Sequence, residues 1–424
     1  MNGGVRKRGK TWSYYFDLGK VDGKRKKKEK GGFRTKKEAE QALAAALNEY
    51  NNAGTVFEPS EITVSDYLDQ WYELYCKPNL KYNTQVLYLR TIEGHIKPKF
   101  GSYKLKVLNP AVLQEYANNL KLNGYSRRHI MGILTMFQSA LDYAIEPLHY
   151  ISQNPMKSVK TPKVEKKPRE RIILTMEEWD TIIDHFRGTR YYIPLMIGFY
   201  TGLRISEAFA LTWDDIDLKN KTLSVNKQIV KRNFGADVRK VVEKQGKREQ
   251  RSSWYFTTPK TQTSTRTIPF GDTLYSALKQ EKARQLENEL KYGEYYTIHV
   301  LKKEIDEKGN DMWRIVPVQK CVESQLQRTK LICITENGQY TSTDTFKVCS
   351  RAIHHELQIA FDYHSLRHTH ATMLIEAGAN VKNVQARLGH TNIQTTLQTY
   401  VHDTEKMGEQ SVELFEQITK AKTS

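Results

Sequence analysis

The sequence predicts a multidomain protein. A small α+β unit with a three-stranded sheet and one helix comes first, an all-α bundle second, and a larger, mainly α unit with a small antiparallel sheet third. The 424 residues are too many for one ordinary hydrophobic core. The apolar pattern is strand-like at the N-terminus, becomes helical, and is then interrupted by a basic, proline-containing stretch. We therefore place domains at 1–55, 63–155 and 172–407, an interdomain linker at 156–171 and a tail helix at 408–424.

The chain is strongly basic, with 66 Lys and Arg against 48 Asp and Glu and a net charge of +18. This balance indicates a polyanionic partner. Nucleic acid is the leading candidate, because basic side chains that neutralise phosphates release counterions. A basic ribosome-associated or membrane-surface protein is the alternative on charge alone. No stretch approaches the ~20 apolar residues of a membrane span, so we expect no membrane partner.

The cysteine pattern indicates a reducing compartment. The chain has four cysteines and no CxxC pair, which argues against a disulfide framework or a zinc ribbon. The basic N-terminus is not followed by an apolar run, so it does not resemble a secretory signal. We expect a cytoplasmic protein.

The N-terminal unit is the most basic part of the chain, with fourteen basic and three acidic residues in 1–37. Aromatic and basic runs on either side of an Asp22-Gly23 turn predict paired strands. Thr35 and Glu38 have the spacing of a capping box before the helix that follows. We expect the basic sheet face to bind a DNA groove; a solvated face without a target is the alternative. The candidate DNA-binding residues are Arg6, Lys7, Arg8, Lys26, Lys27 and Lys28.

The middle of the chain changes to helical periodicity. Helices are predicted from Thr63 onwards and over 83–96, 110–122 and 126–145. The linker at 156–171 contains two prolines and seven basic residues. A stretched basic linker suits a clamp whose halves lie on opposite sides of a duplex.

The C-terminal unit is predicted to be mainly helical, with a strand at Thr222–Val225. Two polar, basic segments, 231–253 and 289–328, are predicted to be insertions. The second has the pattern of a β-hairpin, and 331–335 followed by an Asn-Gly turn predicts another hairpin.

Tyr400 is a candidate nucleophile because of its sequence neighbours. A tyrosine on an apolar helix face is most often a core residue with a satisfied hydroxyl, which is the alternative here. His390 lies ten residues earlier, directly after Gly389, a predicted helix C-cap. His364 and Arg367 lie three residues apart on a preceding helix and are predicted to share a face. Short capped helices would bring these side chains to a single phosphate.

Two further basic residues are candidates for chemistry on a phosphate. Arg204 follows a Thr201-Gly202 turn into a predicted apolar helix, where its planar fork could grip two phosphoryl oxygens. Otherwise it would be an ordinary solvated or ion-paired arginine. Lys260 begins a predicted turn between two strands, and a lysine on a mobile hairpin could approach the departing oxygen of DNA. Its alternative role is that of one phosphate-contacting lysine among many.

The histidine spacing does not favour a metal site. A zinc-protease motif needs a glutamate after its first histidine, and Ser365 stands there. His370 also lies about 160° around an ideal helix from His368. We expect neither a structural nor a catalytic metal.

Taken together, these residues resemble the catalytic boxes of the tyrosine recombinase (phage integrase) family. All six catalytic positions stand in the family's order with similar spacing. The bundle resembles the family's core-binding domain, and the N-terminal unit resembles the arm-type DNA-binding domain of integrases from prophages and conjugative transposons. The two insertions depart from compact members. The resemblance rests on Thr201-Gly202-Leu203-Arg204, Lys260, His364-Ser365-Leu366-Arg367-His368, Leu388-Gly389-His390 and Tyr400.

The resemblance implies a site-specific recombinase that cuts and rejoins DNA through a 3′-phosphotyrosyl bond, and so integrates and excises a mobile element. Tyr400 would be the nucleophile. Arg204 and Arg367 would hold the non-bridging oxygens and stabilise the transition state. No metal, nucleotide or other cofactor would be required, since the covalent intermediate keeps the bond energy for rejoining.

The remaining roles follow from the same resemblance. Lys260 would protonate the leaving 5′-oxygen, and His364 would assist proton loss from the tyrosine. His390 would hydrogen-bond the phosphate, and Glu207 would orient its neighbours. The implied partners are double-stranded DNA at core and arm attachment sites, a homotetramer on DNA, an excisionase and a host DNA-bending protein, all in the cytoplasm of a bacterial host.

Three other functions stay open on the sequence: a type IB topoisomerase-like enzyme, a housekeeping tyrosine recombinase, and a catalytically silent DNA-binding regulator. The basic N-terminal unit argues against the first two, and the intact catalytic positions argue against the third. In the tail, Val412, Phe415 and Ile418 form an apolar stripe. That stripe would pack on its own domain or on a neighbouring protomer.

Overall fold

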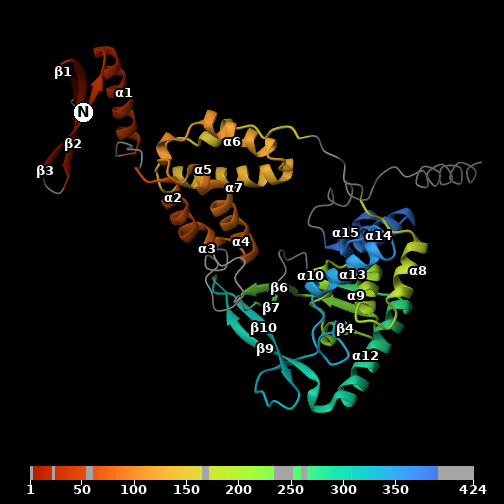
Figure 1. The fold of residues 1–424 in the computed structure, drawn as a ribbon. Coiled ribbons are helices and arrows are strands. Elements are labelled where there is room, and N and C mark those ends of the chain that lie inside the picture. The colour runs from red at the N-terminus through yellow and green to blue at the C-terminus, as the bar shows by residue number, and fades with distance from the viewer. Residues whose placement is uncertain are drawn as a thin grey trace, which may run out of the picture. The chain divides into compact units, whose positions relative to one another are not determined.

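The protein consists of two compact units, Met1–Lys166 and Lys167–Ser424. The computed structural model describes residues 3–21, 24–53, 61–164, 171–233, 252–258, 265–306 and 308–389 (Figure 1). The boundary between the units falls inside the stretch that the sequence assigns to a linker. The predicted tail helix at 408–424 lies outside the described residues.

The chain begins with an antiparallel sheet of order β1-β2-β3 backed by a helix, as predicted. Tyr14 and Phe16 form the core beneath the helix. The predicted capping box is present: the Thr35 hydroxyl accepts a hydrogen bond from the Glu38 N–H at 3.2 Å, and the Glu38 carboxylate accepts one from the Thr35 N–H at 3.3 Å. The predicted turn at 22–23 lies outside the described residues. The elements are β1 Gly3–Arg8, β2 Thr11–Val21, β3 Lys24–Phe33 and α1 Lys36–Ala53.

An all-helical bundle follows, again as predicted. Side chains of Thr63, Asn109 and Ser126 accept N-terminal N–H groups and so fix three helix starts. Two π-helical turns, η1 and η2, interrupt the early helices. The elements are α2 Val64–Trp71, η1 Tyr72–Cys76, α3 Lys77–Asn79, α4 Tyr82–Thr91, η2 Ile92–Ile96, α5 Lys97–Phe100, η3 Leu105–Val107, α6 Pro110–Leu122, α7 Arg127–Ile145 and η4 Pro155–Ser158.

The helices of the second unit pack around α9, which is buried along almost its whole length. Trp179 of α8 stacks on Phe199 of α9 with ring centroids 3.9 Å apart. From α14, the Tyr363 hydroxyl donates a hydrogen bond to the Pro194 carbonyl of α9 at 3.0 Å. The elements are α8 Met176–His185, α9 Tyr192–Thr201, α10 Ile205–Ala208, η5 Trp213–Asp215, α12 Asp272–Tyr292, η7 Gly293–Tyr295, α13 Thr343–His355, α14 Tyr363–Glu376 and α15 Val381–Leu388.

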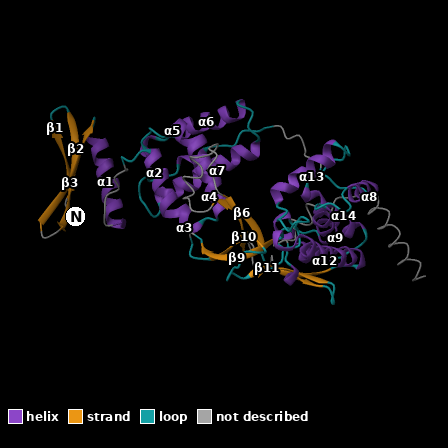
Figure 2. Ribbon diagram, turned by 60° about the horizontal axis from the view of Figure 1, so that its bottom comes forward, coloured by secondary structure: helices purple, strands orange, loops and turns teal. Residues whose placement is uncertain are grey.

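Two antiparallel sheets accompany these helices, of order β11-β9-β10-β7-β6 and β4-β5-β8. The segment 289–328, predicted as an insertion, supplies β9, β10 and the first residue of β11, and thus most of the larger sheet. Figure 2 shows this sheet beside the helical part of the unit. The strands are β4 Ile216–Asp217, β5 Thr222–Val225, β6 Gln228–Asn233, β7 Ser252–Thr257, β8 Arg266–Pro269, β9 Thr297–Ile305, β10 Asp311–Gln319 and β11 Arg328–Thr329.

The hairpin predicted from 331–335 and the Asn-Gly turn is present in minimal form, as a tight turn closed by an antiparallel bridge between Ile334 and Tyr340. Another local prediction for this unit differs from the structure. The apolar helix predicted after Arg204, from the spacing of Ile205, Ala208 and Leu211, is shorter than expected and ends at Ala208. The Leu211 carbonyl accepts a hydrogen bond from the Ile332 N–H, so the backbone there pairs with the 331–332 segment instead of continuing the helix.

Among the helices described, none is long and apolar enough to cross a membrane.

Candidate active site

The site begins at the turn that ends α9. Gly202 adopts a left-handed conformation with φ of 66°, which favours glycine. A Cβ atom there would lie 2.9 Å from both the His370 and Leu388 side chains. The turn can therefore approach α14 and α15 closely only without a side chain. It delivers Arg204 to the start of α10.

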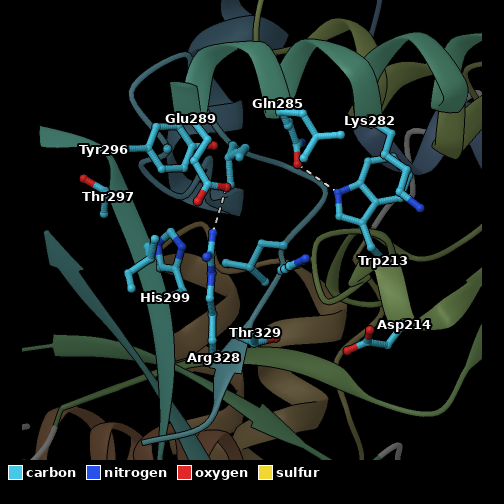
Figure 3. Close-up of a pocket in the computed structure, with 16 residues that line it drawn as sticks. Trp213, Asp214, Lys282, Gln285, Glu289, Tyr296, Thr297, His299, Arg328 and Thr329 are labelled. Carbon is cyan, nitrogen blue, oxygen red and sulfur yellow. Dashed lines mark hydrogen bonds and ion pairs between the residues drawn. The ribbon is translucent and has the colours of Figure 1, made fainter. Parts of the chain in front are cut away.

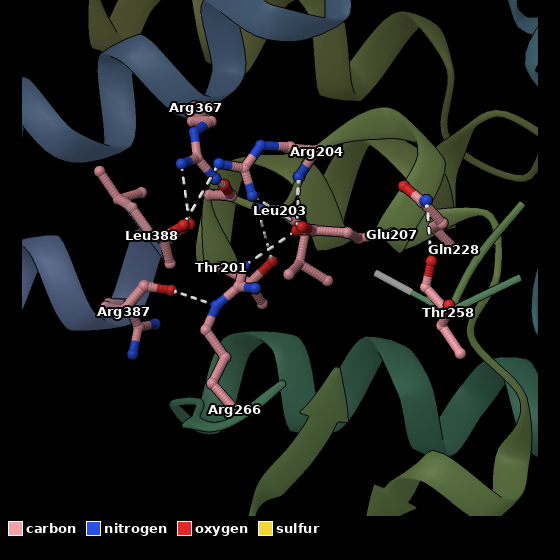
Figure 4. A network of polar contacts seen from close by, with 12 residues as sticks. Thr201, Leu203, Arg204, Glu207, Gln228, Thr258, Arg266, Arg367, Arg387 and Leu388 are labelled. Carbon is pink, nitrogen blue, oxygen red and sulfur yellow. Dashed lines mark hydrogen bonds and ion pairs between the residues drawn. The ribbon is translucent and has the colours of Figure 1, made fainter. Parts of the chain in front are cut away.

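Arg367 reaches the same place from α14. Its side chain is 1% exposed. It donates hydrogen bonds to the Gly202 carbonyl and the Leu388 carbonyl, both at 2.8 Å (Figure 4). Arg204 donates to the Gly389 carbonyl at 3.3 Å and to the Glu207 carboxylate at 2.8 Å. The two arginines expected to hold a phosphate thus lie on adjacent carbonyls at the end of α15.

A third arginine joins them from β8. Arg266 donates its Nε hydrogen to the Arg387 carbonyl at 2.8 Å and an Nη2 hydrogen to Glu207 at 2.9 Å. The last carbonyls of a helix lack intrahelical donors and carry partial negative charge. At residues 387, 388 and 389, each of three successive carbonyls receives a different guanidinium group.

Glu207 is the carboxylate at the centre of this network. Burial acts to raise its pKa, but Arg266 and then Arg204 outweigh burial and hold the pKa below its usual value. Glu207 is therefore ionised at neutral pH. Its Oε1 accepts a hydrogen bond from the Arg204 side chain, and its Oε2 accepts one from the Arg266 side chain.

The histidines of α14 occupy different environments. His364 is exposed, and its ring lies edge-to-face with His368 at 4.7 Å. Desolvation of its ring, followed by the positive charge of Arg367, lowers the pKa of His364. His370 faces inward, where it bonds the Phe199 carbonyl at 2.8 Å and accepts from Arg387 Nε at 2.9 Å. His364 and Arg367 thus differ in exposure, although the sequence predicts a shared face.

In the described ranges, no group of three or more His, Cys, Asp or Glu side chains is placed so that it could hold a metal ion. A cavity of about 200 Å³ lies between α12 and strands β9 and β11 (Figure 3). Buried His299 lines it, and burial and Arg328 lower the pKa of that histidine to about 4. None of the described candidate catalytic residues lines this cavity.

Three predicted catalytic residues, Lys260, His390 and Tyr400, lie outside the described residues. Of the strands that flank Lys260 in the sequence, β7 pairs with β6 and β10, and β8 pairs with β5. The expectation that Lys260 lies on a turn between two strands falls on residues outside the described ranges.

The candidate DNA-binding residues lie on the N-terminal sheet. Arg6, Lys7 and Arg8 on β1 and Lys27 on β3 are exposed, whereas Lys28 is partly buried; the side chain of Lys26 is not described. Glu29 on β3 pairs with Arg6 and, at 3.2 Å, with Arg8. These two ion pairs link β1 to β3, and the side chains of Lys7 and Lys27 remain exposed to solvent.

Sequence reasoning missed two residues that organise the site, Arg266 and Arg387. Arg387 binds His370, the Pro269 carbonyl at 2.9 Å and the Tyr200 carbonyl at 3.0 Å. The available signal was weak: each is one basic residue among many, and nothing local shows that it turns inward.

Comparison with known proteins gives three matches along the chain. The Phage integrase family matches residues 172–407, an Arm DNA-binding domain matches 5–50, and the N-terminal SAM-like domain of phage integrases matches 63–121. A tyrosine recombinase XerC-like protein of Caldanaerobacter subterraneus is 28% identical over 386 residues, which cover 90% of this chain and 89% of that protein. The integrase of a Staphylococcus phage is 25% identical over 397 residues, covering 89% and 99%.

Solved structures share the fold. The Tn1549 transposon integrase in complex with a circular intermediate DNA has a TM-score of 0.60 at 22% identity, covering 84% of this chain and 99% of that one. A lambda integrase tetramer bound to a Holliday junction has a TM-score of 0.54 at 16% identity, covering 89% and 91%.

The turn at Gly202 yields a stability prediction. Gly202→Ala should lower the free energy of unfolding by about 1–3 kcal/mol, because it combines a strained left-handed backbone with overpacking. Denaturant unfolding measures the change. Gly132→Ala is the control, since a Cβ there meets open space within α7 and should be neutral or slightly stabilising. Equal stability of the Gly202→Ala variant and the parent would contradict the tight packing.

Proposed function

Because the chain belongs to the phage integrase family and is a tyrosine-type site-specific recombinase, we propose that it cuts and rejoins double-stranded DNA through a 3′-phosphotyrosyl intermediate. The product is the integration or excision of a mobile element. The observation that carries the proposal is the pair of guanidinium groups, Arg204 and Arg367, held on neighbouring carbonyls of one helix end.

These two cations suit a phosphodiester in the act of exchange. A pentacoordinate phosphate gathers negative charge on its non-bridging oxygens, and donors fixed beforehand stabilise that charge without reorganisation. Hydrogen bonds to the Gly202 and Leu388 carbonyls fix the plane of the Arg367 guanidinium. Hydrogen bonds to Glu207 and the Gly389 carbonyl fix that of Arg204. The Arg204 side chain is 36% exposed, so an incoming phosphate can reach it.

The covalent step would proceed as a simple exchange. The Tyr400 oxygen bonds to phosphorus as the phosphorus–5′-oxygen bond breaks, and the tyrosine proton passes to a base. Lys260 gives a proton to the departing 5′-oxygen, and His390 hydrogen-bonds the phosphate. A free 5′-hydroxyl then reverses the sequence on a new partner strand. Bond energy stays in the phosphotyrosine, so no nucleotide is consumed.

His364 is suited to assist the proton transfer from Tyr400. Desolvation and Arg367 lower its pKa, so the ring is neutral at pH 7 and can accept a proton. A tyrosine of ordinary pKa, ~10, needs such help together with the nearby positive charge.

The same proposal assigns the partners. The N-terminal sheet would bind arm sites and the bundle core sites, which fits the matches to arm-binding and SAM-like domains. The lambda integrase related in fold forms a tetramer on a Holliday junction, and we propose a homotetramer here. An excisionase and a host DNA-bending protein would set direction.

Tyr400→Phe should abolish covalent capture of DNA while site binding stays nearly unchanged, because one hydroxyl is lost. A suicide core-site duplex, resolved by denaturing gel, measures the adduct. The same assay separates a recombinase from a silent DNA-binding regulator. Persistent adducts in the Tyr400→Phe variant would show that another residue is the nucleophile.

Substituting either phosphate-holding arginine should slow cleavage. Arg204→Ala or Arg367→Ala should reduce the single-turnover rate by on the order of 10²-fold or more, as for the loss of a transition-state donor. Lysine at either position should not restore the rate, because a point charge cannot make two planar contacts. Near-parental rates in both lysine variants would refute the clamp.

Deleting residues 1–55 should separate the two DNA-binding activities. The truncated protein should still cleave a short core-site duplex, since all six candidate catalytic residues lie beyond position 200, but it should lose binding to a separate arm site. Electrophoretic mobility shifts on each duplex measure the difference. A folded truncation that cannot cleave the core site would contradict the modular reading.

A further inference from the structure

Arg266 occupies a position that the reaction scheme leaves without a role. Its side chain is 8% exposed, and that of Glu207 is 5% exposed. From β8 it bridges two parts of the site, with one hydrogen bond to Glu207 and one to the Arg387 carbonyl near the end of α15. It also packs beneath the neighbouring helix cap, because a Cβ on Gly389 would lie 2.9 Å from its Nη1.

These contacts link Arg266 to Arg204, a proposed catalytic residue, through Glu207. Glu207 divides its two oxygens, giving Oε1 to Arg204 and Oε2 to Arg266. Glu207 also accepts the Arg204 backbone N–H at 3.1 Å through the same oxygen that Arg266 binds. Arg204 in turn donates to the Gly389 carbonyl, two residues beyond the carbonyl that Arg266 holds. Glu207 therefore holds both the backbone N–H and the guanidinium of Arg204, and Arg266 holds Glu207.

We propose that Arg266 is a positioning residue for strand cleavage: by anchoring Glu207 to the end of α15, it holds the Arg204 guanidinium in the orientation that receives the phosphate. This inference rests on the proposed function of Arg204. Arg266 itself would not contact the reacting atoms. A displacement of about 1 Å in a catalytic group can cost ~10²-fold in rate, so an anchor of this kind has a measurable effect.

The chemistry of the contact explains why arginine is needed. Its Nε and Nη2 hydrogens point in two fixed directions within one plane, and they meet a carbonyl and a carboxylate on different elements. A lysine ammonium could keep the charge beside Glu207, but it lacks the planar fork that holds the carbonyl as well. Arg266→Lys should therefore restore the electrostatic part of the role and not the geometric part.

The proposal also predicts a change in pH dependence. Among the described residues, the charged or titratable groups that face Glu207 are Arg204, Arg266 and the buried Tyr363. Without Arg266, burial still disfavours the Glu207 carboxylate, and within the described ranges Arg204 is the cation left to oppose burial. The pKa of Glu207 would then rise, and the carboxyl would gain a proton as the pH falls. A protonated Glu207 holds Arg204 less firmly, so cleavage should weaken progressively at lower pH.

The experiment measures single-turnover cleavage of a suicide core-site duplex between pH 5.5 and 8 with the full-length protein. Arg266→Ala should slow cleavage by about 10–100-fold at pH 7, and the ratio of parental to variant rate should grow as the pH falls. Arg266→Lys should give a smaller loss with a nearly constant ratio. Core-site binding should be retained in both variants.

Arg284→Ala is the matched control. Arg284 forms a bidentate ion pair with buried Glu281 on α12 at 2.7 and 2.8 Å, in the same unit and outside the site. Its removal should leave both the rate and the pH profile unchanged. Thermal unfolding of every variant shows whether the fold is retained, and Arg266→Lys carries the test if Arg266→Ala does not fold.

A double-mutant cycle tests whether the effect passes through Glu207. If it does, Arg266→Ala should add little to the loss already caused by Glu207→Gln. A full additional loss in the Glu207→Gln background would overturn the proposal, as would a rate ratio for Arg266→Ala that does not change with pH. For Arg266→Lys, cleavage at the parental rate would overturn it. Failure of the proposed function looks different: the parental protein would then form no covalent adduct, whatever residue stands at 266.

Discussion

The end of α15 is the feature on which the candidate site depends. A helix of eight residues finishes with carbonyls that no intrahelical N–H can reach, and this end carries the negative side of the helix dipole. Three guanidinium groups satisfy those carbonyls, from Arg266, Arg367 and Arg204 in sequence order of the acceptors. The arginines come from a strand, a long helix and a turn, so one short helix brings three distant segments of the chain together.

Close packing makes this convergence possible, and glycine permits the packing. At Gly198 in α9, a Cβ would lie 2.6 Å from the Leu366 side chain, and at Gly202 it would meet α14 and α15 side chains. The absence of side chains lets α9 lie directly against α14. Tyr363 then reaches the Pro194 carbonyl, and Arg367 on the next turn of α14 reaches the Gly202 carbonyl. The packing of α14 against α9 therefore also places the Arg367 guanidinium at the Gly202 carbonyl.

Several arginines gather around one carboxylate in the described part of the site, and this arrangement suits its proposed substrate. Burying a charge is costly unless a partner compensates it. Glu207 compensates part of the positive charge, and carbonyl dipoles compensate another part. A phosphate between Arg204 and Arg367 would supply further negative charge. Desolvation is the main cause of the lowered pKa of His364, and the positive charges of Arg367 and Arg204 lower it further.

The sequence by itself determined the fold class and the family, because helix caps, apolar periodicity and motif order are local properties, and its candidate catalytic residues stay predictions. It also placed Gly389 at a helix end and Thr35 and Glu38 in a capping box. It could not show that β7 and β8 belong to different sheets, that the segment 289–328 builds most of the larger sheet, or that a helix after Arg204 would stop at Ala208. Nor could it single out Arg266 among 66 basic residues. Those outcomes depend on which distant backbone groups meet, and only the tertiary structure decides that.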